Sequence, residues 1–219
     1  MFAPVIARLG EAVNCVVVRY PDKPLDYEAL IAHARSALPA SGDFFLLGES
    51  FSGPIAIALA AEAPARMQGL ILSATFVRNP LPWTGPLARL VEVLPVSGAP
   101  AALMTSLILG KFSTGQLRAQ IAASLAQMSP STIRSRLRAI ASVDASDKLA
   151  AVGMPILYLR AEHDLLVPPS AGRLLKRLKP AAQVLSFEAP HFLLQVAVDD
   201  AASAIRDFLT KLTASPPFP

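Results

Sequence analysis

Short apolar runs alternate along the chain with stretches whose apolar residues recur at helical spacing. The apolar runs are residues 14–20, 43–47, 69–75, 155–159 and 183–187, and the helix-like stretches are 26–38, 53–65, 170–178 and 199–212. Runs this apolar are typical of strands buried on both faces, and helices between them connect parallel neighbours. We therefore predict an α/β fold, a mostly parallel sheet with helices on both faces.

Residues 81–152 interrupt this alternation. The stretch lacks strand character, and its apolar spacing predicts helices near residues 87–94, 101–109, 114–128 and 131–141. It is too long for a simple connection between two strands. We interpret it as a helical cap, inserted between the two parts of the core (1–80 and 153–219) and placed over the carboxyl ends of the strands.

Length and composition favour one globular domain. The chain has 219 residues, of which 53% are hydrophobic and 16% charged, so a large core is available and disorder is not expected. The longest uncharged stretch in the predicted cap, and therefore the candidate for a membrane-spanning helix, is residues 93–110, which contains Pro95, Gly98 and Pro100. It lacks the uniform apolar character of a spanning helix, so we expect no stable membrane insertion.

Charge, histidine and cysteine content argue against a nucleic-acid-binding protein and against a metalloprotein. The net charge of +4 comes from basic residues at helical spacing beside apolar ones, without interleaved aromatics, so we expect no nucleic-acid partner. Three dispersed histidines and the single cysteine, Cys15, give no metal-ligand spacing, and no dinucleotide-type phosphate loop is present, so neither a metal nor another cofactor is expected. The opening residues do not resemble a signal peptide, which makes a cytoplasmic location the default expectation.

The strongest local motif is Gly48-Glu49-Ser50-Phe51-Ser52-Gly53, between a predicted strand and an Ala-rich helix. A serine nucleophile on a strained strand-to-helix turn needs small residues two positions to either side. Gly48 meets that need, and Ser52 stands where glycine is usual. The alternative is a Gly/Ser turn without chemistry, and the motif alone does not decide between them.

Two further residues, Asp164 and His191, follow predicted strands just as Ser50 does. Asp164 follows the fourth predicted strand and His191 follows the fifth, so both lie at the carboxyl edge of the sheet with Ser50. Taken singly, each is equally well explained as an ordinary turn or loop residue. Together they have the order Ser, Asp, His that is characteristic of a hydrolase triad, and one sheet edge allows them to converge. We predict that the three form a catalytic triad.

Segments 46–53, 160–168 and 189–195 resemble the α/β-hydrolase superfamily, in its capped esterase and acyl-hydrolase branch, and the resemblance extends from residue 4 onward. It implies that Ser50 attacks an acyl carbon, His191 is the general base, and Asp164 orients His191. It also implies that the backbone N–H of Phe51 is one oxyanion donor. Glu49 is not assigned as a base, because adjacent side chains diverge.

The resemblance also indicates that one strand and one loop of the superfamily are missing from this chain. In the superfamily a strand lies between the predicted strands 14–20 and 43–47, and the Gly-rich loop after it supplies the second oxyanion N–H. Residues 1–10 resemble the helix that follows this loop, so we expect an N-terminally truncated fold with exposed sheet edges open to self-association. The leading hypothesis is a hydrolase of apolar esters or related acyl compounds, with Trp83, Met104 and Phe112 in the cap. The alternative is a hydrolase-like binding protein, or a fragment, with impaired catalysis.

Overall fold

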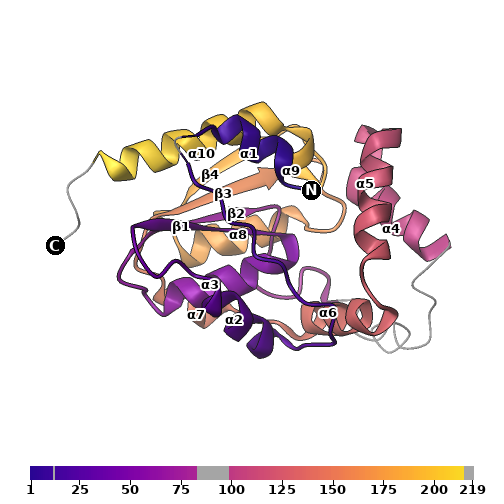
Figure 1. The fold of residues 1–219 in the computed structure, drawn as a ribbon, viewed down its shortest axis with the longest axis horizontal. Helices are drawn as coiled ribbons and strands as arrows, with labels where there is room; N and C mark the ends of the chain where they lie inside the picture. Colours follow the sequence, from indigo (N-terminus) through magenta and orange to yellow (C-terminus); the bar gives the residue numbers. More distant parts are fainter. Residues whose placement is uncertain (12, 83–98, 215–219) are drawn as a thin grey trace.

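The computed structural model describes residues 1–11, 13–82 and 99–214, and its centre is a sheet of four parallel strands (Figure 1). The strands are β1 (Phe44–Glu49), β2 (Met67–Ser73), β3 (Ile156–Ala161) and β4 (Gln183–Phe187), and their order in space equals their order in the chain. Leu72 lies opposite Tyr158, and Leu159 lies opposite Leu185. The prediction of a parallel α/β sheet is confirmed.

Helices cover both faces of the sheet, because successive strand residues point to opposite sides. Leu72 and Tyr158 pack with α3 (Gly53–Ala61), α7 (Ser146–Ala151) and α8 (Pro169–Leu178). Ile71 and Leu159 pack on the other face with α1 (Ala3–Leu9), α9 (Leu193–Val196) and α10 (Val198–Thr213). Figure 1 shows these two helical layers with the sheet between them, and α2 (Tyr27–Ser36) adds a further layer outside α3.

Between β2 and β3 the described residues form helices. They are α4 (Ala99–Leu109), the 3-10 turn η3 (Gly110–Phe112), α5 (Gly115–Ala126), α6 (Pro130–Ser142) and α7. Figure 1 shows α4 and α5 to one side of the sheet, where Leu109 and Ile121 pack against Phe192, the neighbour of His191. The predicted helix at 87–94 and Trp83 lie outside the described residues, and the division into core and cap stays a prediction.

The prediction of a strand at residues 14–20 is wrong. This segment has no regular secondary structure, and β1 pairs with β2 alone among the described strands. Its side chains divide between two cores: Cys15 packs beside α1 and α10, whereas Val18 and Tyr20 pack beside α2 and α3. Val16 is 70% exposed. An apolar, β-branched run needs a hydrogen-bonding neighbour to become a strand, and no neighbouring strand lies beside this one in the described structure.

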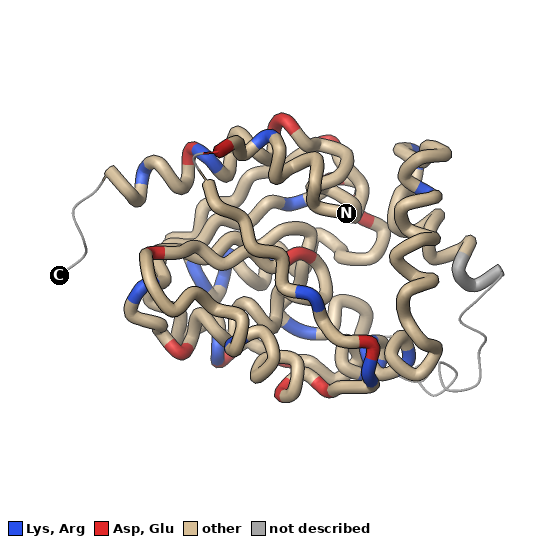
Figure 2. Tube along the Cα trace, viewed as in Figure 1, with Lys and Arg blue, Asp and Glu red and all other residues tan. Residues whose placement is uncertain are grey.

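Charges of both signs are interleaved over the outer helices (Figure 2). They form exposed ion pairs such as Arg35 with Glu62 and Lys148 with Glu28. Such pairs contribute little to stability but keep the helical faces hydrated. None of the helices in the described part of the chain combines the length and the apolar character needed to cross a membrane.

Candidate active site

Ser50 occupies a strained turn at the carboxyl end of β1. It opens the 3-10 turn η1 (Ser50–Ser52) that leads into α3, and its φ of +51° lies in the left-handed region, where side chains are disfavoured. A Cβ on Gly48 would approach the Cβ of Ala56 to 2.8 Å, and one on Gly53 would lie 1.9 Å from Oγ1 of Thr75. Glycine at both positions therefore lets α3 fold back closely over the sheet and leaves Ser50 at the bend.

Side-chain hydrogen bonds hold this turn in place. The Ser52 hydroxyl donates to the Glu49 carbonyl (2.8 Å) and accepts from the Glu49 N–H (2.9 Å). Thr75 Oγ1 donates to the Ser50 carbonyl (2.5 Å), and the buried Tyr158 hydroxyl donates to the Thr75 carbonyl (3.0 Å). The serine that stands where glycine is usual thus closes the turn, and these bonds offset the strain at Ser50.

Asp164 and His191 lie on loops at the same edge. Asp164 comes three residues after β3, and its Oδ1 accepts hydrogen bonds from the backbone N–H groups of Leu166 and Val167, both at 2.8 Å. Its side chain is only 3% exposed, so these two bonds fix the direction of the second oxygen. His191 comes four residues after β4 and is itself buried.

The three predicted residues meet in one hydrogen-bonded chain. Ser50 Oγ lies 2.7 Å from His191 Nε2, and His191 Nδ1 lies 2.8 Å from Asp164 Oδ2. The carboxylate can only accept, so Nδ1 carries the hydrogen of the neutral ring and Nε2 is left free to accept from the serine hydroxyl. This arrangement can remove a proton from Ser50 and hold the resulting imidazolium beside a carboxylate.

Phe51, whose N–H is the predicted oxyanion donor, follows Ser50 in the turn. Its ring stacks on Tyr27 with centroids 5.2 Å apart, and its carbonyl accepts a hydrogen bond from the Tyr27 hydroxyl (3.3 Å). The guanidinium of Arg136, from α6, lies 5.7 Å from the centroid of the Phe51 ring. These contacts hold Phe51 by packing on both sides. The same cluster is shielded from water, and burial raises the pKa of the neighbouring Tyr20 to about 12 and lowers the pKa of Arg136.

Sequence reasoning missed the environment of Glu49. Its Oε2 accepts a hydrogen bond from Gln195 Nε2 (3.2 Å), and its enclosed Oε1 has no hydrogen-bond partner among the described residues. Burial raises the pKa of this carboxyl to about 7, although the Gln195 hydrogen bond and the nearby His191 act in the opposite direction. An acidic residue at the last position of an otherwise apolar strand is the signal that could have drawn attention to it.

The other histidines do not join the triad. His163 Nε2 lies 2.9 Å from Glu188 Oε1, which also accepts from Lys111 Nζ at 2.9 Å, and all three side chains are largely exposed. His33 Nε2 lies 2.8 Å from the Arg19 carbonyl. Within the described ranges, no group of three or more His, Cys, Asp or Glu side chains is arranged to hold a metal ion.

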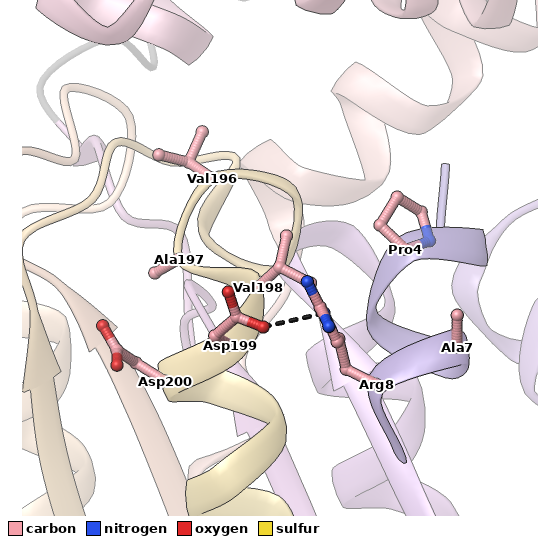
Figure 3. Close-up of a pocket in the computed structure, with 8 residues that line it drawn as sticks. All are labelled: Pro4, Ala7, Arg8, Val196, Ala197, Val198, Asp199 and Asp200. Carbon is pink, nitrogen blue, oxygen red and sulfur yellow. Dashed lines mark ion pairs between the residues drawn. The ribbon is translucent and has the colours of Figure 1, made fainter. Parts of the chain in front are cut away.

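A separate surface pocket of about 550 Å³ lies between α1 and the start of α10 (Figure 3). Figure 3 shows Arg8 and Asp199 facing each other across it, with Arg8 Nε 2.8 Å from Asp199 Oδ1. Both side chains are well exposed, and none of Ser50, Asp164 and His191 lines the pocket. It is a groove between two helices rather than part of the triad site.

Comparison with known proteins identifies the family. The model of the serine aminopeptidase S33 hydrolases matches residues 15–191, which is most of the chain and includes all three triad positions. The chain belongs to this α/β-hydrolase family.

Relatives of this α/β-hydrolase include enzymes that act on several acyl compounds. A protein of Klebsiella pneumoniae (strain 342) with the provisional name carbamate hydrolase RutD is 28% identical over 177 residues, 73% of this chain and 64% of its own length. The pimeloyl-[acyl-carrier protein] methyl ester esterase of Nitrosomonas europaea is 26% identical over 162 residues, 68% of this chain and 64% of its own. The chain thus spans a little under two thirds of the length of these relatives.

A solved structure has the same fold. The enol-lactonase of Burkholderia xenovorans LB400 superposes with a TM-score of 0.75 at 22% identity, covering 88% of this chain and 76% of its own. At this identity the likeness concerns the fold alone.

Proposed function

We propose that this α/β-hydrolase is a serine hydrolase that cleaves carboxylic esters or related acyl compounds through an acyl-enzyme. The observation that carries the proposal is the continuous chain from Ser50 Oγ through His191 to Asp164, with contacts of 2.7 and 2.8 Å. A serine hydroxyl is a weak nucleophile unless a base removes its proton, and His191 Nε2 is within reach to do so.

In the proposed reaction, Ser50 Oγ attacks the acyl carbon while its proton passes to His191 Nε2. The imidazolium, stabilised by Asp164, then gives that proton to the leaving alcohol as the acyl–oxygen bond breaks. A water molecule attacks the acyl-enzyme in the second half, with His191 again as the base. The Phe51 N–H is one donor for the developing oxyanion, and loss of one such donor typically costs about 10²–10³ in rate.

The substrate is proposed to be a small acyl compound with an apolar part. Leu165, the neighbour of Asp164, is 57% exposed, and Leu103 on α4 is 62% exposed, so apolar surface lies both beside the triad and on the helices near it. The two relatives are named for an ester and a carbamate, and both of these compounds contain a carbonyl carbon open to attack by a serine. We also propose a cytoplasmic location, and self-association along the side of β1 that has no partner among the described strands.

A fluorophosphonate probe tests the proposal, because it phosphonylates only an activated serine. We expect the folded chain to be labelled, the label to disappear in Ser50→Ala, and the label to persist in Ser36→Ala, which removes a hydroxyl bonded to its own helix. Hydrolysis of p-nitrophenyl esters of increasing chain length, compared with an aminoacyl p-nitroanilide, then separates an esterase from an aminopeptidase.

Absence of labelling in a folded sample would argue against catalysis. That result would favour the second candidate, a hydrolase-like protein that keeps the triad geometry but binds a ligand without turning it over. Labelling at a serine other than Ser50 would also refute the assignment of the nucleophile.

A further inference from the structure

Glu49 is a second carboxyl group beside the triad, and the reaction proposed above does not use it. The residue ends β1 and immediately precedes Ser50, but its side chain points to the helix that follows His191. There Gln195 Nε2 donates to Glu49 Oε2 at 3.2 Å, while the backbone N–H of Gln195 bonds back to the Phe192 carbonyl. The strand that carries the nucleophile is therefore tied to the short helix directly after the base.

The hydrogen bonding of this pair is incomplete. Glu49 Oε1 and Gln195 Oε1 are both enclosed, and neither has a partner among the described residues. Each is an acceptor that lacks a donor, and protonation of the carboxyl group would remove the need for a donor at Glu49 Oε1. Glutamine at position 49 would keep one oxygen acceptor and carry no charge, so Glu49→Gln isolates what the charge of the acid adds.

The groups around Glu49 show that its negative charge would interact with His191. The His191 imidazole, the Gln195 amide and the Leu194 backbone N–H favour the ionised carboxyl, whereas burial, the largest influence, opposes it. Coulomb attraction is mutual, so an ionised Glu49 stabilises a proton on His191 as much as that proton stabilises the carboxylate. His191 also has Asp164 on its far side, so the ring lies under the influence of two carboxyl groups.

We propose that Glu49 is a positioning residue for His191, which holds the base through Gln195 and stabilises the imidazolium that forms when Ser50 loses its proton. Glu49 neither gives nor takes a proton in the reaction, and the Ser50 proton still moves to His191 Nε2 and on to the leaving group. The inference rests on the proposed serine hydrolase function. It adds an electrostatic requirement that the triad geometry alone does not contain.

The test compares wild type with Glu49→Gln, which keeps size and hydrogen bonding but removes the charge. We expect kcat/KM for p-nitrophenyl acetate to fall about tenfold at pH 9, where Glu49 is ionised, and to approach the wild-type value near pH 5.5, where it is neutral in both proteins. The matched control is Glu62→Gln, the same chemical change at an exposed residue paired with Arg35, and it should leave the profile unchanged. A loss in Glu49→Gln that is equal at every pH, or no loss at all, would overturn the proposal.

A second measurement does not depend on activity. NMR of the three labelled histidine rings reports on the surroundings of His191 directly. In wild type the His191 signals should show an inflection near pH 7, where Glu49 ionises, and this inflection should be absent in Glu49→Gln. The wild-type inflection can be seen even if the variant does not fold. If the inflection is present but no ester is cleaved, the proposed function fails and the coupling stands; if wild type shows no inflection near pH 7, the coupling itself is refuted.

Discussion

Replacement of Glu49 by glutamine should stabilise the protein at alkaline pH and leave its stability unchanged near pH 4. An unfolded glutamate loses its proton near pH 4.5, whereas burial raises the pKa of Glu49 in the folded protein to about 7. Between these values the folded state binds more protons than the unfolded state, so stability falls as pH rises through this window. Over about 2.5 pH units the loss reaches roughly 3 kcal/mol, as an upper value. Glutamine does not titrate, so Glu49→Gln avoids this loss of stability.

Urea denaturation at pH 4, 5.5, 7 and 8.5 measures the difference. The free energies of unfolding of Glu49→Gln and wild type should coincide at pH 4 and diverge up to pH 8, the variant being more stable. The control Glu62→Gln should behave in the opposite sense. Arg35 lowers the pKa of the Glu62 carboxyl, which therefore stabilises the folded state above pH 4.5 and loses that effect as the pH falls.

Two results would refute this reasoning on stability, and a third would refute the proposed part of Glu49 in the reaction. A variant that is less stable than wild type at pH 8.5 would mean that the charge of the Glu49 carboxylate strengthens its hydrogen bonds by more than the burial of that charge costs. A constant difference at all pH values would mean that Glu49 has the same ionisation in the folded and unfolded states. A gain in stability without a loss of activity at high pH would show that the charge is costly but has no part in the reaction.

Three other substitutions test the turn and the triad. Thr75→Val removes the donor to the Ser50 carbonyl and should lower the free energy of unfolding by about 1–3 kcal/mol in urea denaturation, with slower fluorophosphonate labelling. Gly53→Ala places a methyl group against Thr75 and should cost about 1–3 kcal/mol, measured in the same way, whereas Gly153→Ala, with open space around it, should be neutral. Asp164→Asn should keep the fold by circular dichroism but lower kcat by about 10³–10⁴, because the base loses its orienting carboxylate.

The fold was largely predictable because its information is local. Each strand of the described sheet is a short apolar run, and helix-like stretches separate these runs in the sequence, so the pattern alone predicted β1 to β4 and their parallel direction. The edge at which Ser50, Asp164 and His191 meet follows from the same rule, since the carboxyl ends of parallel strands share one edge.

Residues 14–20 show where local information ends. The run has the composition of a buried strand, and its side chains are indeed divided between two apolar clusters. Strand formation, however, depends on a partner with free backbone groups at the correct distance, and composition does not specify one. In the structure, side chains of residues 14–20 pack against apolar clusters as the pattern predicts. The segment forms no strand, because the pattern does not specify a partner strand.

Glu49 shows a second limit, on the scale of single side chains. Alternation along a strand correctly predicts that residue 49 points away from Ser50, and from this the sequence suggests that it is irrelevant to the chemistry. The residue that makes it relevant is Gln195, 146 positions later, on a helix that also begins just after His191. Because Gln195 on that helix donates to Glu49, a side chain that diverges from the nucleophile is tied to the segment after the base instead. Ser50 and Glu49, neighbours in the chain, therefore contact one short segment at two points, His191 and Gln195, and a change at either should alter the reaction.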